Sequence, residues 1–287
     1  MCRILAVESV PQSSSPFVPK NLLEQFAKAC ESEEWNAPDK CQQKDGWGLY
    51  AVAPDYHGIA AILSDTQKLV NKEGTSHFEY QFQLTVWKIY YTSLNEIWNV
   101  AEAQLLANLL PPATQLLVHA RAALNGEGIL ANNQPFVSDT TAFATNIAFS
   151  SLEKVNWMKR LKQEYPDWRL ISKQIGAERI FHLFEEILKK EASVAAALIK
   201  LNQQLSNYAI IHGMNIVTMS DDGMAALCGT HVDQQVDPAL AKYYTLHHGK
   251  ATQGTKKLTV IASAPFGGLQ LAPMKAGEVI STHDIVS

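Results

Sequence analysis

The chain begins Met1-Cys2-Arg3-Ile4-Leu5-Ala6-Val7, an apolar run with a cysteine at its second position. Because the side chain of Cys2 is small, we expect removal of the initiator methionine, which would leave a thiol and a free α-amine on one residue. The thiol is a nucleophile, and the amine, with a reference pKa of about 7.7–8.0, is a base near neutral pH. The pattern therefore predicts a nucleophile that carries its own base. The alternative is an incidental buried cysteine at the start of a strand.

Composition describes a globular chain with a large core, since 47% of the 287 residues are apolar and 18% are charged. The net charge of −4 and the absence of a basic run argue against a nucleic-acid partner. No apolar run approaches the roughly 18 residues that a membrane span needs, so we expect no membrane partner. The four cysteines show neither metal-ligand spacing nor a disulfide framework, and a reducing, cytoplasmic location is expected. We expect no metal: an adjacent pair such as His247-His248 could bind one, but in a strand such a pair more often points one side chain in and one out. We expect no cofactor, and Gly267-Gly268 lacks the lysine and the helix of a phosphate-binding loop.

Hydrophobic spacing predicts the elements of the chain. Helical spacing is found at residues 21–30, 94–110, 177–190 and 194–205. Strand-like or apolar runs are found at residues 2–7, 48–53, 59–63, 78–91, 115–120, 141–149, 208–219, 224–228, 243–247, 258–263 and 279–280. Residues 54–58 resemble a hairpin loop, and Asp221-Asp222-Gly223 a tight turn. Strands come first, helices follow and strands return, which favours an α+β fold of antiparallel sheets covered by helices.

Six segments, in this order along nearly the whole chain, resemble the glutaminase domain of class II glutamine amidotransferases, a branch of the N-terminal nucleophile hydrolases. They are Met1-Cys2-Arg3-Ile4-Leu5-Ala6, Asp45-Gly46-Trp47-Gly48-Leu49, Val118-His119-Ala120-Arg121-Ala122-Ala123, Asn132-Asn133-Gln134-Pro135-Phe136, residues 215–229 and Val260-Ile261-Ala262-Ser263-Ala264-Pro265-Phe266. The chain is most similar to stand-alone amidohydrolases of this class, such as the ergothioneine-pathway γ-glutamyl hydrolase, rather than to the long fused synthases.

The resemblance implies a single domain over residues 1–287 whose mature start is Cys2, folded as a four-layer αββα sandwich of two antiparallel sheets flanked by helices (Ntn-hydrolase-like). It implies that Cys2 attacks the carbonyl of a glutamine-like or γ-glutamyl small-molecule amide. A thioester forms, ammonia or an amine leaves, and water hydrolyses the thioester. The resemblance suggests no acceptor domain, so ammonia would pass to a partner protein or be released.

The same resemblance assigns substrate-binding roles. Arg121 matches the arginine that grips the substrate's carboxylate, a task that suits the bidentate fork of a guanidinium; the alternative is a surface ion pair. Trp47 and Gly48 would shape the pocket beside Cys2, although Trp47 could equally be a core residue. Gln134 takes the place of the family's histidine in a loop that we expect to support the pocket.

Two departures from the family pattern bear on activity. The family's His-Asn-Gly motif, whose asparagine side chain and glycine amide form the oxyanion hole, reads Thr145-Asn146-Ile147 here. Asn146 keeps the side-chain donor. The backbone N–H of Ile147 could still serve as the second catalytic donor, but its Cβ penalises a left-handed backbone and its side chain could narrow the site. Gly176 stands where the family has the aspartate that pairs with the substrate's α-ammonium. Asp139 or Glu127 could compensate.

These departures leave two functions open. The intact Cys2, Arg121 and Asn146 favour an N-terminal-cysteine amide hydrolase. The changes at Ile147 and Gly176 favour a catalytically degenerate relative that acts as a binding or structural subunit. If the enzyme is active, the missing aspartate predicts poor use of free glutamine, because an unpaired ammonium in a dry pocket costs several kcal/mol.

Overall fold

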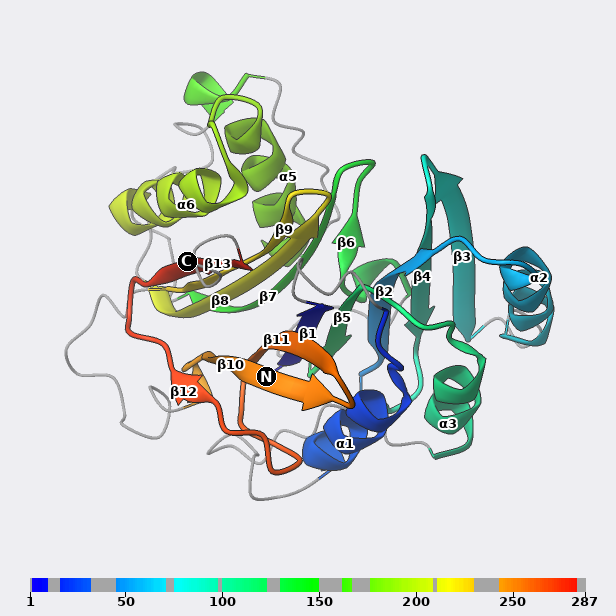
Figure 1. The fold of residues 1–287 in the computed structure, drawn as a ribbon. Helices are drawn as coiled ribbons and strands as arrows, with labels where there is room; N and C mark the ends of the chain where they lie inside the picture. The colour runs from blue at the N-terminus through cyan, green and yellow to red at the C-terminus, as the bar shows by residue number, and fades with distance from the viewer. Residues whose placement is uncertain are drawn as a thin grey trace.

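Two antiparallel sheets lie face to face, and helices cover the outer face of each (Figure 1). The computed structural model describes residues 2–9, 16–31, 45–70, 75–97, 100–122, 130–149, 162–166, 176–208, 211–229 and 243–282. Within these residues, the larger sheet has eight strands and the smaller has five. This arrangement confirms the predicted α+β, four-layer αββα sandwich.

The strands of the two sheets come from both ends of the chain. In spatial order, the described strands of the larger sheet are β12 (Ala272–Pro273), β10 (His247–Gln253), β11 (Lys256–Ala262), β1 (Arg3–Ser9), β5 (Gln115–Ala120), β2 (Trp47–Pro54), β4 (Val86–Ser93) and β3 (Ser76–Gln83). Those of the smaller sheet are β13 (Val279–Ser281), β9 (Gly223–Cys228), β8 (Ile211–Ser220), β7 (Thr141–Phe149) and β6 (Phe136–Val137). The larger sheet therefore continues past the short edge strand β6.

The helices of the described residues divide between the two outer faces. They are α1 (Lys20–Glu31), α2 (Ile59–Val70), α3 (Val100–Leu109), α5 (Gly176–Leu188) and α6 (Val194–Tyr208), with a 3-10 turn at Leu130–Asn132. Helices α1, α2 and α3 pack on the larger sheet, and α5 and α6 on the smaller one. Among the helices of the described segments, none has the length and apolar character needed to cross a membrane.

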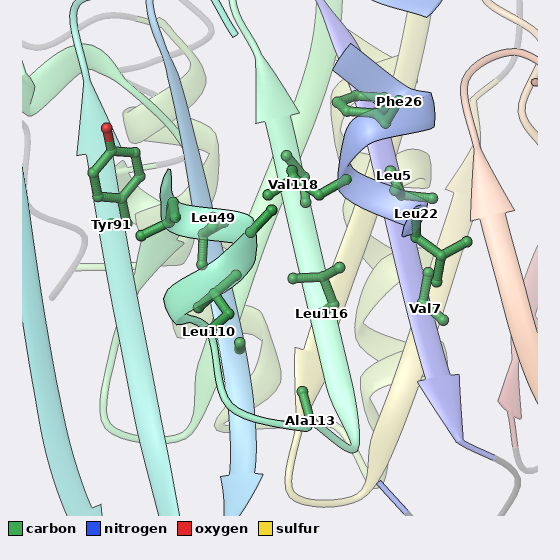
Figure 2. Packing of buried hydrophobic residues seen from close by; sticks show 14 of the residues in the cluster. Leu5, Val7, Leu22, Phe26, Leu49, Tyr91, Leu110, Ala113, Leu116 and Val118 are labelled. Carbon is green, nitrogen blue, oxygen red and sulfur yellow. The ribbon is translucent and has the colours of Figure 1, made fainter. Parts of the chain in front are cut away.

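Three buried layers result from this packing. Figure 2 shows the layer between α1 and the larger sheet, where Leu22 and Phe26 lie over Leu5, Val7 and the strands beside them. A second layer fills the space between the sheets, and a third lies between the smaller sheet and α5 and α6. Both faces of β1 are therefore covered, which explains why all seven of its residues are buried. A strand buried on both faces reads as a continuous apolar run, as residues 4–7 do.

The strongest periodic segments of the sequence form the predicted elements. Helices α1, α5 and α6 lie where the apolar spacing predicts them, and the hairpin of β8 and β9 turns at Asp221-Asp222-Gly223, with Gly223 at a φ of 111°. Residues 78–91, predicted as strand, form most of two strands, β3 and β4, which are joined by a tight turn at residues 84–85.

Three secondary-structure predictions are wrong. Residues 59–63, predicted as the second strand of a hairpin, begin helix α2 instead, because Ile59, Leu63 and Thr66 are buried on one face at helical spacing. Residues 243–247, predicted as strand, are a turn, and β10 begins only at the last of them. Of the helix predicted over residues 94–110, the described part is α3 (Val100–Leu109), whereas residues 94–97 form bends and turns.

Candidate active site

Cys2 lies immediately before β1, in the middle of the larger sheet. Its carbonyl oxygen accepts two hydrogen bonds, from Asn146 Nδ2 at 3.1 Å and from the Tyr243 hydroxyl at 3.0 Å. Its thiol lies 3.8 Å from the carbonyl oxygen of Ala122, just past the end of β5. The fold thus brings groups from three distant stretches of chain, at Ala122, Asn146 and Tyr243, around one cysteine.

The electrostatic surroundings of the thiol act in opposite directions. Burial raises the pKa of Cys2, and the negative charge of Asp45 adds slightly to this effect. The positive charge of the chain's amino terminus, the hydrogen bond to Ala122 and the charge of Arg121 lower the pKa to a smaller extent. Burial dominates, so the thiol is protonated at neutral pH. A base must therefore remove its proton before it can act as a nucleophile.

Arg121 follows directly after β5 and is 4% exposed, so it is not a surface ion pair. Its backbone is fixed by the neighbouring turn: its N–H donates to Gly46 O at 2.8 Å, and its carbonyl accepts from Asp45 N–H at 3.2 Å. These hydrogen bonds place the turn at residues 45–46 directly beside Arg121. The backbone of Arg121 is thus fixed, and its positive charge lies close enough to lower the pKa of the Cys2 thiol; a guanidinium at this place suits the capture of a carboxylate.

Asn146 and Ile147 are neighbours on β7 and face opposite sides of the smaller sheet. Asn146 is buried and points to Cys2, whereas Ile147 packs against the cluster under α5 and α6. The side chain of Ile147 therefore does not narrow the space beside the thiol. Among the described residues, Leu84 is the one non-glycine residue with positive φ, so Ile147 also carries no left-handed strain.

Gln134 ties the preceding loop to this strand. Its side-chain oxygen accepts the Thr145 N–H at 2.6 Å, one residue before Asn146. Asn133 donates to Ser93 O at 2.6 Å, and the peptide bond between Gln134 and Pro135 is cis. The loop presses on β2 so closely that a Cβ added to Gly48 would lie 2.4 Å from Gln134 O. Gly48 thus permits the close approach of two backbones.

Two predicted substrate-binding residues, Trp47 and Gly176, lie respectively in the hydrophobic core and at an exposed helix start. Trp47 is fully buried on the helix side of the larger sheet, with its ring 4.8 Å from that of Tyr91, which is the core placement left open by the sequence. Gly176 is the exposed first residue of α5, and a Cβ added there would meet no atom within 4 Å. The expected removal of Met1 and the suggested role of Glu127 fall outside the described residues.

Tyr243 could not be found from the sequence, where it lies in a segment predicted as strand. Besides bonding the Cys2 carbonyl, Tyr243 stacks under Arg3, whose guanidinium carbon is 4.3 Å from the ring centroid. Burial raises the pKa of Tyr243 well above its ordinary value, so its hydroxyl stays a donor. The stack positions the residue that follows Cys2, so Tyr243 holds the start of β1 in place.

Two further polar side chains lie fully buried near the site. They are His119 on β5 and Asn215 on β8, which pairs with Asn146 across the strands. Burial lowers the pKa of His119 to about 3, and the charge of Arg121 adds to this effect. His119 is therefore neutral at physiological pH. In the sequence, the one indication that His119 lies near the site was its position two residues before Arg121, in the segment Val118 to Ala123.

Comparisons with known proteins agree with this architecture. No family model matches the chain, and the search of curated proteins returned no match. Among solved structures, 98% of the chain aligns with a glutamine amidotransferase class-II domain protein from Silicibacter pomeroyi, at a TM-score of 0.52, 12% identity and 94% coverage of that chain. It aligns as fully with glutamine phosphoribosylpyrophosphate amidotransferase from Bacillus subtilis, at a TM-score of 0.51 and 12% identity, but spans 47% of that enzyme. The chain therefore has the fold of class II glutamine amidotransferase domains.

Proposed function

We propose that the protein is an amide hydrolase that uses Cys2 as its nucleophile once Met1 has been removed. The observation that carries this proposal is the contact of Asn146 Nδ2 with the Cys2 carbonyl at 3.1 Å. A side-chain amide has two N–H groups. One is used to hold Cys2, and the other remains to meet negative charge that develops beside the thiol.

The reaction would begin with proton transfer from the Cys2 thiol to its own α-amine. The thiolate attacks the carbonyl carbon of the amide, and the carbonyl electron pair moves to oxygen, where Asn146 Nδ2–H donates to it. When the carbon–nitrogen bond breaks, the ammonium formed in the first step returns its proton to the leaving amine. Water then attacks the thioester, the acid leaves, and the thiol is restored. The raised pKa of the thiol makes the neighbouring amine necessary.

Arg121 would select the acyl side of the substrate by pairing with a carboxylate. At the place where the family pattern supplies an aspartate for the α-ammonium, exposed Gly176 offers no charge. The substrate class that fits is a small amide with a free carboxylate and a masked or absent α-amine, such as N-acylglutamine or a dicarboxylic acid monoamide. Ammonia, where it is the product, would be released or passed to a partner protein.

Acid quenching followed by intact-mass measurement tests the nucleophile directly. Protein that starts at Cys2, mixed with a dicarboxylic acid monoamide, should show the mass of an acyl adduct on the peptide that contains Cys2. The Cys2→Ala variant should show neither adduct nor turnover, whereas Cys228→Ala, which removes another buried thiol, should behave as wild type. An adduct that persists in Cys2→Ala, or turnover by that variant, contradicts the proposal.

The alternative function is a catalytically degenerate binding subunit. The exposed, uncharged Gly176 favours it, because a site that holds free glutamine needs a partner for the ammonium. In that case intact mass of protein from its native cell should retain Met1, and no amide should acylate Cys2. Loss of Met1 together with an acyl adduct excludes this alternative.

A further inference from the structure

Asn146 lies on a part of β7 that has a neighbouring strand on one side only. Within the described residues, β7 pairs with β8 along its length, whereas β6 pairs with it at two residues and stops at Phe136, opposite Phe143. Residues 144–146 are buried, so a backbone N–H on the β6 side of this stretch needs another partner. The position of the proposed oxyanion donor therefore depends on what replaces the missing strand.

Gln134 replaces the strand with its side chain. Continuing the register of β6 and β7 by two residues would place Gln134 opposite Thr145, where its backbone carbonyl would accept the Thr145 N–H. That carbonyl faces β2 instead, because a Cβ added to Gly48 would lie 2.4 Å from it. The Thr145 N–H donates to the side-chain oxygen Oε1 of Gln134 at 2.6 Å. A side-chain amide thus takes the place of a backbone carbonyl at the edge of β7.

The contacts of Gln134 form a continuous path to the thiol residue. Oε1 of Gln134 accepts the N–H of Thr145, and the next residue, Asn146, donates from Nδ2 to Cys2 O at 3.1 Å. Gln134 is 4% exposed, so water has little access to compete for the Thr145 N–H. Toward β8, the Thr145 hydroxyl donates to Asn215 O at 2.9 Å. The residue before Asn146 is therefore held from both sides of its strand, and Gln134 supplies the contact on the open side.

We propose that Gln134 is a positioning residue for the oxyanion donor, because it holds Thr145 and thereby directs the amide of Asn146 toward the carbonyl oxygen of the substrate. This role rests on the proposed function, in which Asn146 Nδ2–H meets the developing negative charge. Without the Gln134 acceptor, the buried Thr145 N–H would turn toward another acceptor and carry Asn146 with it, since buried N–H groups seldom stay unpaired. A displacement of about 1 Å can cost about 10²-fold in rate.

Kinetics of Gln134→Met, which keeps the length of the side chain and removes the acceptor, test the assignment. On the amide that wild type hydrolyses fastest, this variant should lower kcat by about 10- to 100-fold and change KM by less than about three-fold, since Asn146 acts on the transition state. Gln115→Met is the matched control. Gln115 is a buried glutamine of β5 whose amide donates to Glu8 at 2.8 Å and to Ser220 O at 3.0 Å. Its loss should lower stability and leave kcat unchanged.

A double variant tests whether Gln134 acts through Asn146. If it does, adding Gln134→Met to Asn146→Ala should lower kcat by no more than about three-fold beyond Asn146→Ala alone, because the residue to be positioned is already gone. If the two losses multiply, the residues act independently and the assignment is overturned.

The side-chain amide signals of Asn146 in nuclear magnetic resonance spectra give a readout that needs no substrate. In protein with isotope-labelled asparagine, they are identified by their absence in Asn146→Ala. Gln134→Met should shift them, whereas Gln115→Met should leave them in place. Gln134→Asn, whose amide is drawn back by one methylene group, should also shift them and serves where Gln134→Met does not fold.

Unchanged Asn146 signals in both Gln134 variants, an equal shift in Gln115→Met, or an unchanged kcat in Gln134→Met beside an active wild type would each overturn the assignment. Failure of the proposed function has a different result: wild type then shows no turnover and no acyl adduct. In that case the Asn146 signals still decide whether Gln134 positions this residue.

Discussion

Asn146 and Tyr243 form a natural pair for testing the proposed oxyanion donor, because both donate to the Cys2 carbonyl at nearly the same distance, 3.1 and 3.0 Å. The perturbations are Asn146→Ala and Tyr243→Phe. Each removes one hydrogen bond to that carbonyl, and in each variant the other donor still satisfies it. Neither change therefore leaves a buried acceptor unpaired, and each should cost about 1 kcal/mol of unfolding free energy.

The two variants should differ in rate. Only Asn146 has a second N–H to offer the developing oxyanion, so Asn146→Ala should lower kcat by about 10²–10³-fold. Tyr243→Phe keeps the ring under Arg3 and should lower kcat by less than about ten-fold. The assay measures kcat and KM on the amide that wild type hydrolyses fastest, with urea unfolding of all three proteins alongside. If both variants lose kcat equally, Asn146 acts by holding Cys2 and not as an oxyanion donor.

Three more predictions concern stability and specificity. Gly48→Ala should destabilise the fold by about 3 kcal/mol or more, because the new Cβ would lie 2.4 Å from the backbone oxygen of Gln134, while Gly176→Ala, in open space, should not; urea unfolding measures both. Burial lowers the pKa of His119 from 6.5 to about 3, so the unfolded chain binds a proton before the folded chain does as pH falls. The contribution of neutral His119 to the free energy of unfolding is therefore complete above about pH 6.5 and is lost as pH falls below it. Between pH 7.5 and 5, the wild type should lose about 2 kcal/mol of unfolding free energy that the His119→Leu variant does not lose. His57→Leu, at an exposed histidine, is the control and should behave as wild type. If wild type and His119→Leu have equal pH profiles of stability, His119 is not the group responsible. Gly176→Asp should raise kcat/KM for glutamine relative to its amine-free analogue, because aspartate is favourable at a helix start and restores a partner for the ammonium; an unchanged ratio would mean that another residue faces the amine.

Local sequence patterns were sufficient to predict a helix or strand wherever one spacing of apolar residues continued over a long segment. Helices α5 and α6 could be predicted because their apolar residues recur every three or four positions, and β1 because residues 4–7 form a short continuous apolar run. Residues 59–63 show the limit of this reasoning. Five mostly apolar residues fit a strand and a helix equally, and the choice is made by Thr66 and the rest of α2, whose buried face packs on the larger sheet.

At the site, the sequence by itself determined which chemical groups are present: a thiol at position 2, the guanidinium of Arg121 and the amide of Asn146. It could not determine what lies around them, since contacts across more than a hundred residues leave no periodic trace. Only the tertiary structure placed Tyr243 on the Cys2 carbonyl, Trp47 in the core and the Ile147 side chain away from the thiol. The same holds for a cavity lined by Tyr50, Lys88, Phe136 and Phe181, because its walls come from segments far apart in the chain.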